Sequence, residues 1–170
     1  MNALFYSSLA VAVAATAMVI TRREAIHALL YLVVSLLAVA VAFFSLGASF
    51  AAALEVIIYA GAIVVLFVFV VMLLNLGPAA GEEERRWLGP RMFIGPGILA
   101  SILLIELAFA LSGGQIGGAV AREVSPSEVG RLLFDTYLLG VELAGLLLLA
   151  GLVGACHLGR ADREEGDQSP

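Results

Sequence analysis

The chain has 170 residues, of which 62% are hydrophobic and only 14% are charged. An ordinary soluble domain is about half apolar and about a quarter charged, so this composition excludes a water-soluble globular domain and predicts an integral membrane protein. The net charge of −5 excludes little, because most acids lie in short polar segments, whereas the single cysteine excludes an internal disulfide and a cluster of four thiolates.

Five apolar stretches are long enough to cross the hydrocarbon of a bilayer as helices, which takes about 20 residues each. In chain order they are residues 3–20, 27–46, 51–76, 92–111 and 132–156. Transmembrane strands would need alternating polarity and a closed barrel, so helices are the remaining option. The sequence therefore predicts an all-α membrane protein, with one five-helix domain over residues 1–158 and a polar, flexible tail over residues 159–170.

The arginines predict the orientation. Seven of them follow the first, third and fifth stretches, and two lie on the opposite side. Cytoplasmic segments near the ends of spans carry the excess of positive charge, so we expect the N-terminus outside and the C-terminus in the cytoplasm. Because residues 46–50 are the only link between the second and third spans, these two are expected to be antiparallel neighbours.

Three acids lie inside predicted spans, namely Glu55, Glu106 and Glu142. A charge at such a depth costs about 3 kcal/mol or more unless it is paired or faces a cavity. Glu142 is about ten residues into its span, or roughly 15 Å, which places it close to the midplane. It has two interpretations: a group on a proton pathway, or a protonated side chain bonded to a nearby carbonyl. Glu106 is expected to be interfacial.

Glu55 and Tyr59 are one turn apart on the same helical face. A carboxyl and a phenol at this spacing can relay a proton through water. The alternative is an interfacial acid next to an aromatic residue of the membrane interface. His27 and His157 fall at the cytoplasmic ends of their helices and are expected to be interfacial, and no motif indicates a metal, haem or nucleotide site.

Small residues recur one turn apart in the last span, as Gly140 with Ala144 and Gly151 with Ala155. Such positions allow the close approach of another helix. Five helices with almost no extramembrane mass are expected to use these faces against other subunits.

The stretch LEVIIYAGAIVVLFVFVVMLLNL, residues 54–76, resembles the third helix of the J subunit (chain 6 in mitochondria) of respiratory NADH:quinone oxidoreductase. That family has an acid or Gln, then V-Y-x-G-A, then V-L-F-x-F-V-x-M-L. The stretches HALLYLVVSLLAVAVAFFSLGASFAAA and GRLLFDTYLLGVELAGLLLLAGLVGA are similar to the second and last helices of the family. The likeness covers all five spans and is strongest over residues 27–76 and 130–155.

The resemblance implies a bacterial inner-membrane, multi-pass subunit of a proton-translocating enzyme, without an active site or a redox cofactor of its own. NADH, flavin, iron–sulfur clusters and quinone would be bound by other subunits. The implied partners are small three-helix subunits, the quinone-adjacent subunit, antiporter-like subunits and the lipid bilayer, with no nucleic acid. The implied coupling candidates are Glu55, Tyr59, Gly61, Val65 and Glu142.

Gly61 lies between two alanines near the middle of the third span. These small residues fit close packing against a neighbouring helix, or an inserted residue, which is a π-bulge and is typical of functional sites. The resemblance favours the bulge. One extra residue turns the downstream helix by about 100°, which would re-aim Val65 relative to Glu55 and Tyr59.

Other function classes remain open for this sequence. One is a related membrane subunit of a multisubunit cation/proton antiporter or of a membrane-bound hydrogenase. Another is a purely structural assembly subunit whose acids are incidental. An independent transporter is disfavoured, because five spans cannot divide into two equal repeats.

Overall fold

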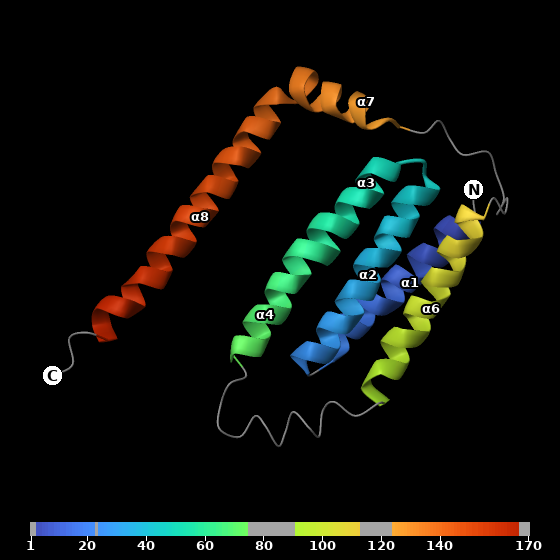
Figure 1. Ribbon diagram of the computed structural model, residues 1–170, viewed down its shortest axis with the longest axis horizontal. Helices are drawn as coiled ribbons and strands as arrows, with labels where there is room; N and C mark the ends of the chain where they lie inside the picture. The colour runs from blue at the N-terminus through green and yellow to red at the C-terminus, as the bar shows by residue number, and fades with distance from the viewer. Residues whose placement is uncertain (1–2, 23, 75–90, 113–123, 167–170) are drawn as a thin grey trace. The chain divides into compact units, whose positions relative to one another are not determined.

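A computed structural model describes residues 3–22, 24–74, 91–112 and 124–166, and every regular element in these residues is a helix (Figure 1). In chain order they are α1 (Ala3–Thr21), α2 (Ala25–Ser45), α3 (Ser49–Leu54), η1 (Glu55–Ile63), α4 (Val64–Leu74), α6 (Arg91–Leu111), α7 (Pro126–Arg131), η2 (Leu132–Thr136) and α8 (Leu138–Gly166). The elements η1 and η2 are π-helices.

Five helical stretches of the described residues are long and apolar enough to cross a membrane. They are Ala3–Thr21, Ala25–Ser45, Ser49–Leu73, Phe93–Ala110 and Leu138–Gly159. The predicted all-helical architecture with five spans is confirmed, and the first four predicted stretches agree with these to within a few residues. The last two residues of the predicted third span, 75 and 76, lie outside the described residues.

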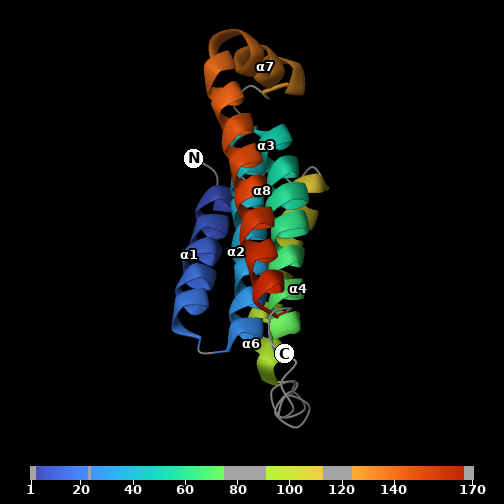
Figure 2. The same cartoon turned by 90° about the vertical axis from the view of Figure 1, so that its left-hand side faces the viewer.

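The chain forms two compact units, Met1–Val124 and Ser125–Pro170, and each is described by itself. In the first unit α2 is the central helix, because it contacts α1, α3, η1, α4 and α6. Both views place α2 between α1 and the continuous α3–η1–α4 helix (Figures 1 and 2). The antiparallel arrangement of the second and third spans, expected from their short link, is therefore observed.

Small residues bring α1 and α2 close together. Ala15 of α1 and Ala38 of α2 are completely buried. They belong to one core cluster with apolar residues of α1, α2 and α6: Leu4, Val11, Ala12, Val34, Val41 and Leu103. Lipid offers no hydrophobic gain for bringing two apolar helices together, so close backbone approach over small residues is what holds such a pair.

A polar contact lies inside the same seam. The hydroxyls of Thr16 and Ser35 are 2.7 Å apart, and they lie 2.8 Å and 3.3 Å from the Ala12 carbonyl. One hydroxyl therefore donates to the other, and the second donates to this carbonyl. An unsatisfied hydroxyl in an apolar environment is costly, so these bonds remove the cost and fix the two helices in one register.

The turn between α2 and α3 depends on Gly47, which has φ of 81°. Its N–H donates to the Phe44 carbonyl at 3.0 Å, and the Ala48 N–H donates to the Phe43 carbonyl at 3.1 Å. This pair of bonds is a Schellman cap, which ends a helix on a left-handed residue that is usually glycine. The chain therefore reverses within a few residues and starts the third span beside the second.

The other end of α2 is tied to α6 through Tyr31, which is 4% exposed. Its ring stacks on His27 at 5.2 Å, and the Arg22 guanidinium lies 5.5 Å from the ring centre. A Cβ placed on Gly95 of α6 would overlap the Tyr31 hydroxyl. The absent side chain of Gly95 is therefore what lets α6 approach the Tyr31 end of α2.

The second unit shows a division within the apolar stretch predicted as the fifth span. Residues 132–136 are π-helical rather than part of a regular spanning helix, and Tyr137 leaves the helix with φ of −108° and ψ of 22°. Figure 1 shows the chain bending at this point before α8 begins. The apolar stretch starting at residue 132 is thus divided, and the span begins at Leu138.

The helix α8 continues to Gly166, beyond residue 159, where the flexible tail was expected to begin. The polarity of these residues does not end the helix. A helix that has already formed adds each further residue without a new nucleation cost. Residues 167–170 of the predicted tail lie outside the described residues, and the division into a five-helix domain and a tail stays a prediction.

Candidate functional site

The candidate site is the π-helix η1, which interrupts the third span without breaking it. The flanking residues Leu54 and Val64 both have right-handed helical dihedrals, so α3, η1 and α4 form one continuous helix. The Val64 N–H donates both to the Tyr59 carbonyl, five residues back, and to the Gly61 carbonyl. The expected bulge near Gly61 is therefore observed, and the π-helical segment is nine residues long.

Gly61 suits the π-helical register because the Val56 carbonyl leaves little room for a Cβ at position 61. A Cβ on residue 61 would lie 3.2 Å from the Val56 oxygen, which is tighter than nine in ten real Cβ contacts. Val56 is five residues before Gly61, the acceptor position of a π-helical hydrogen bond. Glycine in a helix interior lowers helix stability by about 1 kcal/mol relative to alanine. Its presence here indicates that the absence of a Cβ is needed at this position. The small residue serves the π register here.

The outward side of this helix carries two of the candidate residues. Tyr59 is 51% exposed and Val65 is 64% exposed, whereas Val64 between them is 3% exposed. Glu55 is half-buried at the first position of η1. Since α2 contacts η1 and α4 on the inner side, Tyr59 and Val65 present their side chains to whatever surrounds this unit.

The structure brings Glu55, Tyr59 and Gly61 into one π-helical segment, with Val65 in the first turn after it. Within the described residues no hydrogen bond joins the Glu55 carboxyl to the Tyr59 hydroxyl. A relay between them through water stays a prediction.

Glu142 lies in the second unit, on α8, and its side chain is exposed there. The span now begins at Leu138, so Glu142 is four residues, or about 6 Å, from its start. The π segment and the bend at Tyr137 separate the residues before Leu138 from the regular helix α8. The depth of Glu142 in the bilayer stays a prediction.

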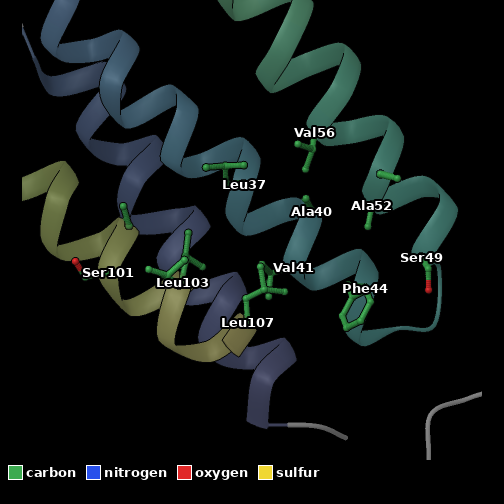
Figure 3. Close-up of a pocket in the computed structure, with 13 residues that line it drawn as sticks. Leu37, Ala40, Val41, Phe44, Ser49, Ala52, Val56, Ser101, Leu103 and Leu107 are labelled. Carbon is green, nitrogen blue, oxygen red and sulfur yellow. The ribbon is translucent and has the colours of Figure 1, made fainter. Parts of the chain in front are cut away.

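The sequence interpretation missed an open apolar groove of about 580 Å³ in the first unit (Figure 3). Its walls are α2, the α3–η1 helix and α6, with Val56 of η1 and Leu103 of α6 among the lining residues. Among the described residues that line it, Ser49 and Ser101 are the ones with polar side chains. A groove formed by residues from three separate spans leaves no periodic signal in any one of them.

The interpretation also missed η2, whose i→i+5 pattern includes a bond of 3.0 Å from the Tyr137 N–H to the Leu132 carbonyl. Nothing in the residue types of LLFDT distinguishes a π-helix from an α-helix. The signal that was available is the capping box at Ser125 and Glu128, which marks a helix start ahead of the predicted span.

Residues that often hold cofactors are scattered. His27 stacks on Tyr31, and His157 and Cys156 are exposed on α8. Among the described residues no three His, Cys, Asp or Glu side chains come close enough to bind one metal ion. The described candidate residues therefore offer carboxyl and phenol groups in an apolar setting, and such groups can bind and release protons.

Comparison with known proteins gives a consistent result. Residues 15–158 match the family model described as NADH-ubiquinone/plastoquinone oxidoreductase chain 6. NADH-quinone oxidoreductase subunit J of Pseudomonas aeruginosa is 56% identical over 162 residues, which cover 95% of this chain and 98% of the relative. The subunit J proteins of Escherichia coli K12 and of a Buchnera aphidicola subspecies are 54% and 45% identical, over 94% of this chain and 86% and 98% of those relatives. The family expected from the third span is confirmed: this chain belongs to the family of NADH-ubiquinone/plastoquinone oxidoreductase chain 6.

Proposed function

We propose that this chain is a membrane subunit of a bacterial proton-translocating NADH:quinone oxidoreductase, and that it helps to couple quinone reduction to proton translocation. Identity to subunit J proteins over nearly the whole chain supports the subunit assignment. The observation that carries the coupling role is the π-helix Glu55–Ile63, which lies inside a spanning helix and next to exposed candidate residues.

In this proposal the chain contributes no redox cofactor. NADH, flavin, iron–sulfur clusters and quinone are bound by other subunits. The partners are the quinone-adjacent subunit, small three-helix subunits and antiporter-like subunits. The third and fifth spans are only 6% and 0% buried, each within its own unit, and this exposed apolar surface supports their contact with such partners or with lipid.

The proposed mechanism is a change of register in η1. Conversion of one π turn to an α turn removes one residue from the turn and rotates the helix after it by about 100°. Val65 would then turn relative to Glu55 and Tyr59. The rotation would open or close a water path along which Glu55 and Tyr59 pass a proton, while Glu142 handles a proton on α8. Such a movement needs no shift of a whole domain.

The orientation has the N-terminus outside and the C-terminus in the cytoplasm, in the inner membrane. The arginine distribution supports it. In a variant without Cys156, a thiol introduced at Gly114 should be modified by an impermeant reagent added to intact cells, and one at Gly81 should not. Both positions lie outside the described residues. The reverse labelling pattern would overturn the orientation.

The subunit assignment is tested by purifying a tagged form of the chain from its native membrane. We expect NADH:quinone oxidoreductase activity and the other subunits to travel with it. Recovery of the chain alone, as a stable homo-oligomer, would refute the assignment.

The proton role of the acids is tested in the assembled complex with Glu55→Gln and Glu142→Gln, which keep the side-chain shape but cannot ionise. We expect proton pumping to fall while NADH oxidation by an artificial acceptor is retained. Glu24→Gln, at the start of α2, is the matched control and should pump normally. Normal pumping and quinone reduction in both variants would leave these acids with a structural role only.

A further inference from the structure

The elements α7 and η2 form one short helical segment, residues 126–136, which does not continue in line with α8. Arg131 and Leu132, at the junction of the two elements, have right-handed helical dihedrals, so the segment is continuous. Figure 1 shows it turned away from α8 at Tyr137, where the chain bends. The span Leu138–Gly159 has 22 residues, and crossing the hydrocarbon takes about 20. The segment 126–136 is therefore not needed to cross the bilayer.

Charged and large apolar side chains lie on opposite sides of segment 126–136. Each residue of an α-helix turns the chain by about 100°, so residues three and four apart share a face. By this count the charged residues and one serine share a polar arc of about 100°, namely Ser127, Glu128, Arg131 and Asp135. The apolar residues, including the one directly after the segment, form an apolar arc on the other side, namely Val129, Leu132, Leu133, Phe134 and Tyr137. The wider turns of η2 shift Asp135 within the polar arc but not out of it. The segment is therefore an amphipathic helix.

The apolar arc is exposed in the structure. The exposed fractions of Leu132, Phe134 and Tyr137 are 52%, 65% and 62%. Contiguous exposed apolar side chains rimmed by polar residues mark a surface that contacts a protein or a membrane. The capping box at Ser125 and Glu128 satisfies backbone N–H groups at the start of the segment, so the helix has its N-terminal bonds without a partner.

Three environments are available to this segment: the hydrocarbon, water, and the boundary between them. In the hydrocarbon, the three charged residues of the polar arc would each be costly. In water, the apolar arc would stay exposed, which is unfavourable. At the boundary the polar arc faces water and the apolar arc faces acyl chains, as in amphipathic helices that lie in the membrane interface. Continuity with α8 also favours lipid over protein as the cover, because the segment ends where a spanning helix starts and because aromatic residues such as Tyr137 are enriched at this depth.

We propose that segment 126–136 is a lipid-binding interfacial helix, which lies along the membrane surface and docks its apolar arc on the acyl chains of phospholipids. The side chain of Arg131, on the polar arc, is available to the phosphate groups of the same lipids. Docking of the segment fixes the level at which α8 enters the bilayer. This inference does not rest on the proposed function.

The docking surface is tested by tryptophan fluorescence of the full chain in nanodiscs that contain brominated phospholipids, because bromine quenches a tryptophan that it contacts. Trp87→Phe removes the single tryptophan of the chain, and Phe134→Trp then places one on the apolar arc. We expect bromine near the headgroup end of the acyl chains to quench it more strongly than bromine near their methyl ends. Ser127→Trp in the same background is the matched control: it lies on the polar arc, leaves all three charged residues in place, and should be quenched less. Equal quenching at the two positions would overturn the proposal, as would quenching of Phe134→Trp that is strongest near the methyl ends.

A second measurement does not depend on the tryptophan variants and separates lipid from a protein partner. A photoreactive benzophenone amino acid takes the place of Phe134, and the chain is illuminated in its native membrane. We expect an adduct of the chain with phospholipid, detected by mass spectrometry. The same group at Ser127 should give little lipid adduct. A cross-link from position 134 to another protein in place of the lipid adduct would assign the apolar arc to a protein interface and refute the proposal.

Discussion

The α1–α2 pair and the third span differ in how much of their apolar surface the first unit buries. The spans Ala3–Thr21 and Ala25–Ser45 are 28% and 39% buried, whereas Ser49–Leu73 is 6% buried. Both helices of the pair are regular α-helices. They pack closely at the buried Ala15 and Ala38, and a hydrogen bond between the Thr16 and Ser35 hydroxyls joins them. The third span contains nine residues of π-helix and carries an acid at the start of that segment.

The difference shows where this chain supplies its own stability. The hydroxyls of Ser8, Thr16 and Ser35 in the α1–α2 pair all have hydrogen-bond partners within the pair, so the pair serves as a scaffold. The third span has an irregular hydrogen-bond register and large exposed side chains, which are features of low-stability segments that change conformation. A scaffold next to a deformable helix is the arrangement that a movement confined to η1 requires.

The largest effect is expected from overpacking the seam. Ala38→Leu would force extra methylenes into a site with no exposed surface, which we expect to destabilise the chain by about 3 kcal/mol. The same change at Ala62, which is exposed in η1, should leave the thermal unfolding of the purified chain nearly unchanged. Thermal unfolding followed by circular dichroism in detergent compares the two. Equal losses would mean that the pair is no more of a scaffold than the third span.

A smaller loss of thermal stability is expected from a change at the contact between α6 and α2. A methyl group in Gly95→Ala would overlap the Tyr31 hydroxyl, at a cost of about 1–2 kcal/mol for an overpacked site. Tyr31→Phe removes that oxygen and should restore part of the stability when the two changes are combined. The two single variants and the double variant are compared in the same unfolding assay. A double variant no more stable than Gly95→Ala would contradict this contact.

The smallest effect is expected from the hydroxyl pair. A double-mutant cycle with Thr16→Val and Ser35→Ala should give a coupling of about 0.6 kcal/mol, the average for such bonds between helices in membranes. The loss from each single change should be modest, because the hydroxyl that remains can donate to the Ala12 carbonyl, which is within reach of both Thr16 and Ser35. Strictly additive losses would show that the 2.7 Å contact contributes nothing.

The number and the approximate positions of the spans could be predicted from the sequence, because length and hydropathy determine them. The ends of the regular helix in the fifth span could not be predicted in this way. Leu132 and Leu133 are as apolar as the residues of α8, and only backbone hydrogen bonding separates them from the span. The π-helix in the third span was predicted because the residues around Gly61 resemble a known family. The composition of the run alone fitted close packing equally well.

The site was predictable only in part, for a related reason. Glu55, Tyr59 and Gly61 are neighbours in sequence, so a helix necessarily brings them together. The burial of the Glu106 Oε2 atom depends on how α6 is rotated against α1 and α2, which the spacing along α6 alone does not fix. The Tyr31–Gly95 contact depends on two spans meeting in one register, and that information lies in the packing of both helices.

The central claim is that the π register of η1 is needed for coupling, and Gly61→Leu tests it most directly. The Cβ of a Leu would lie 3.2 Å from the Val56 oxygen, which is tighter than nine in ten real Cβ contacts, so the backbone would have to shift and the π register should be distorted. Gly97→Leu in α6, where an added Cβ meets nothing within 4 Å, is the matched control. The measurement is the rate of NADH-to-quinone turnover, with pumping, in fully assembled complexes. We predict a slowed rate for Gly61→Leu and a normal rate for Gly97→Leu. A normal turnover rate and normal pumping in an assembled Gly61→Leu complex would contradict the claim.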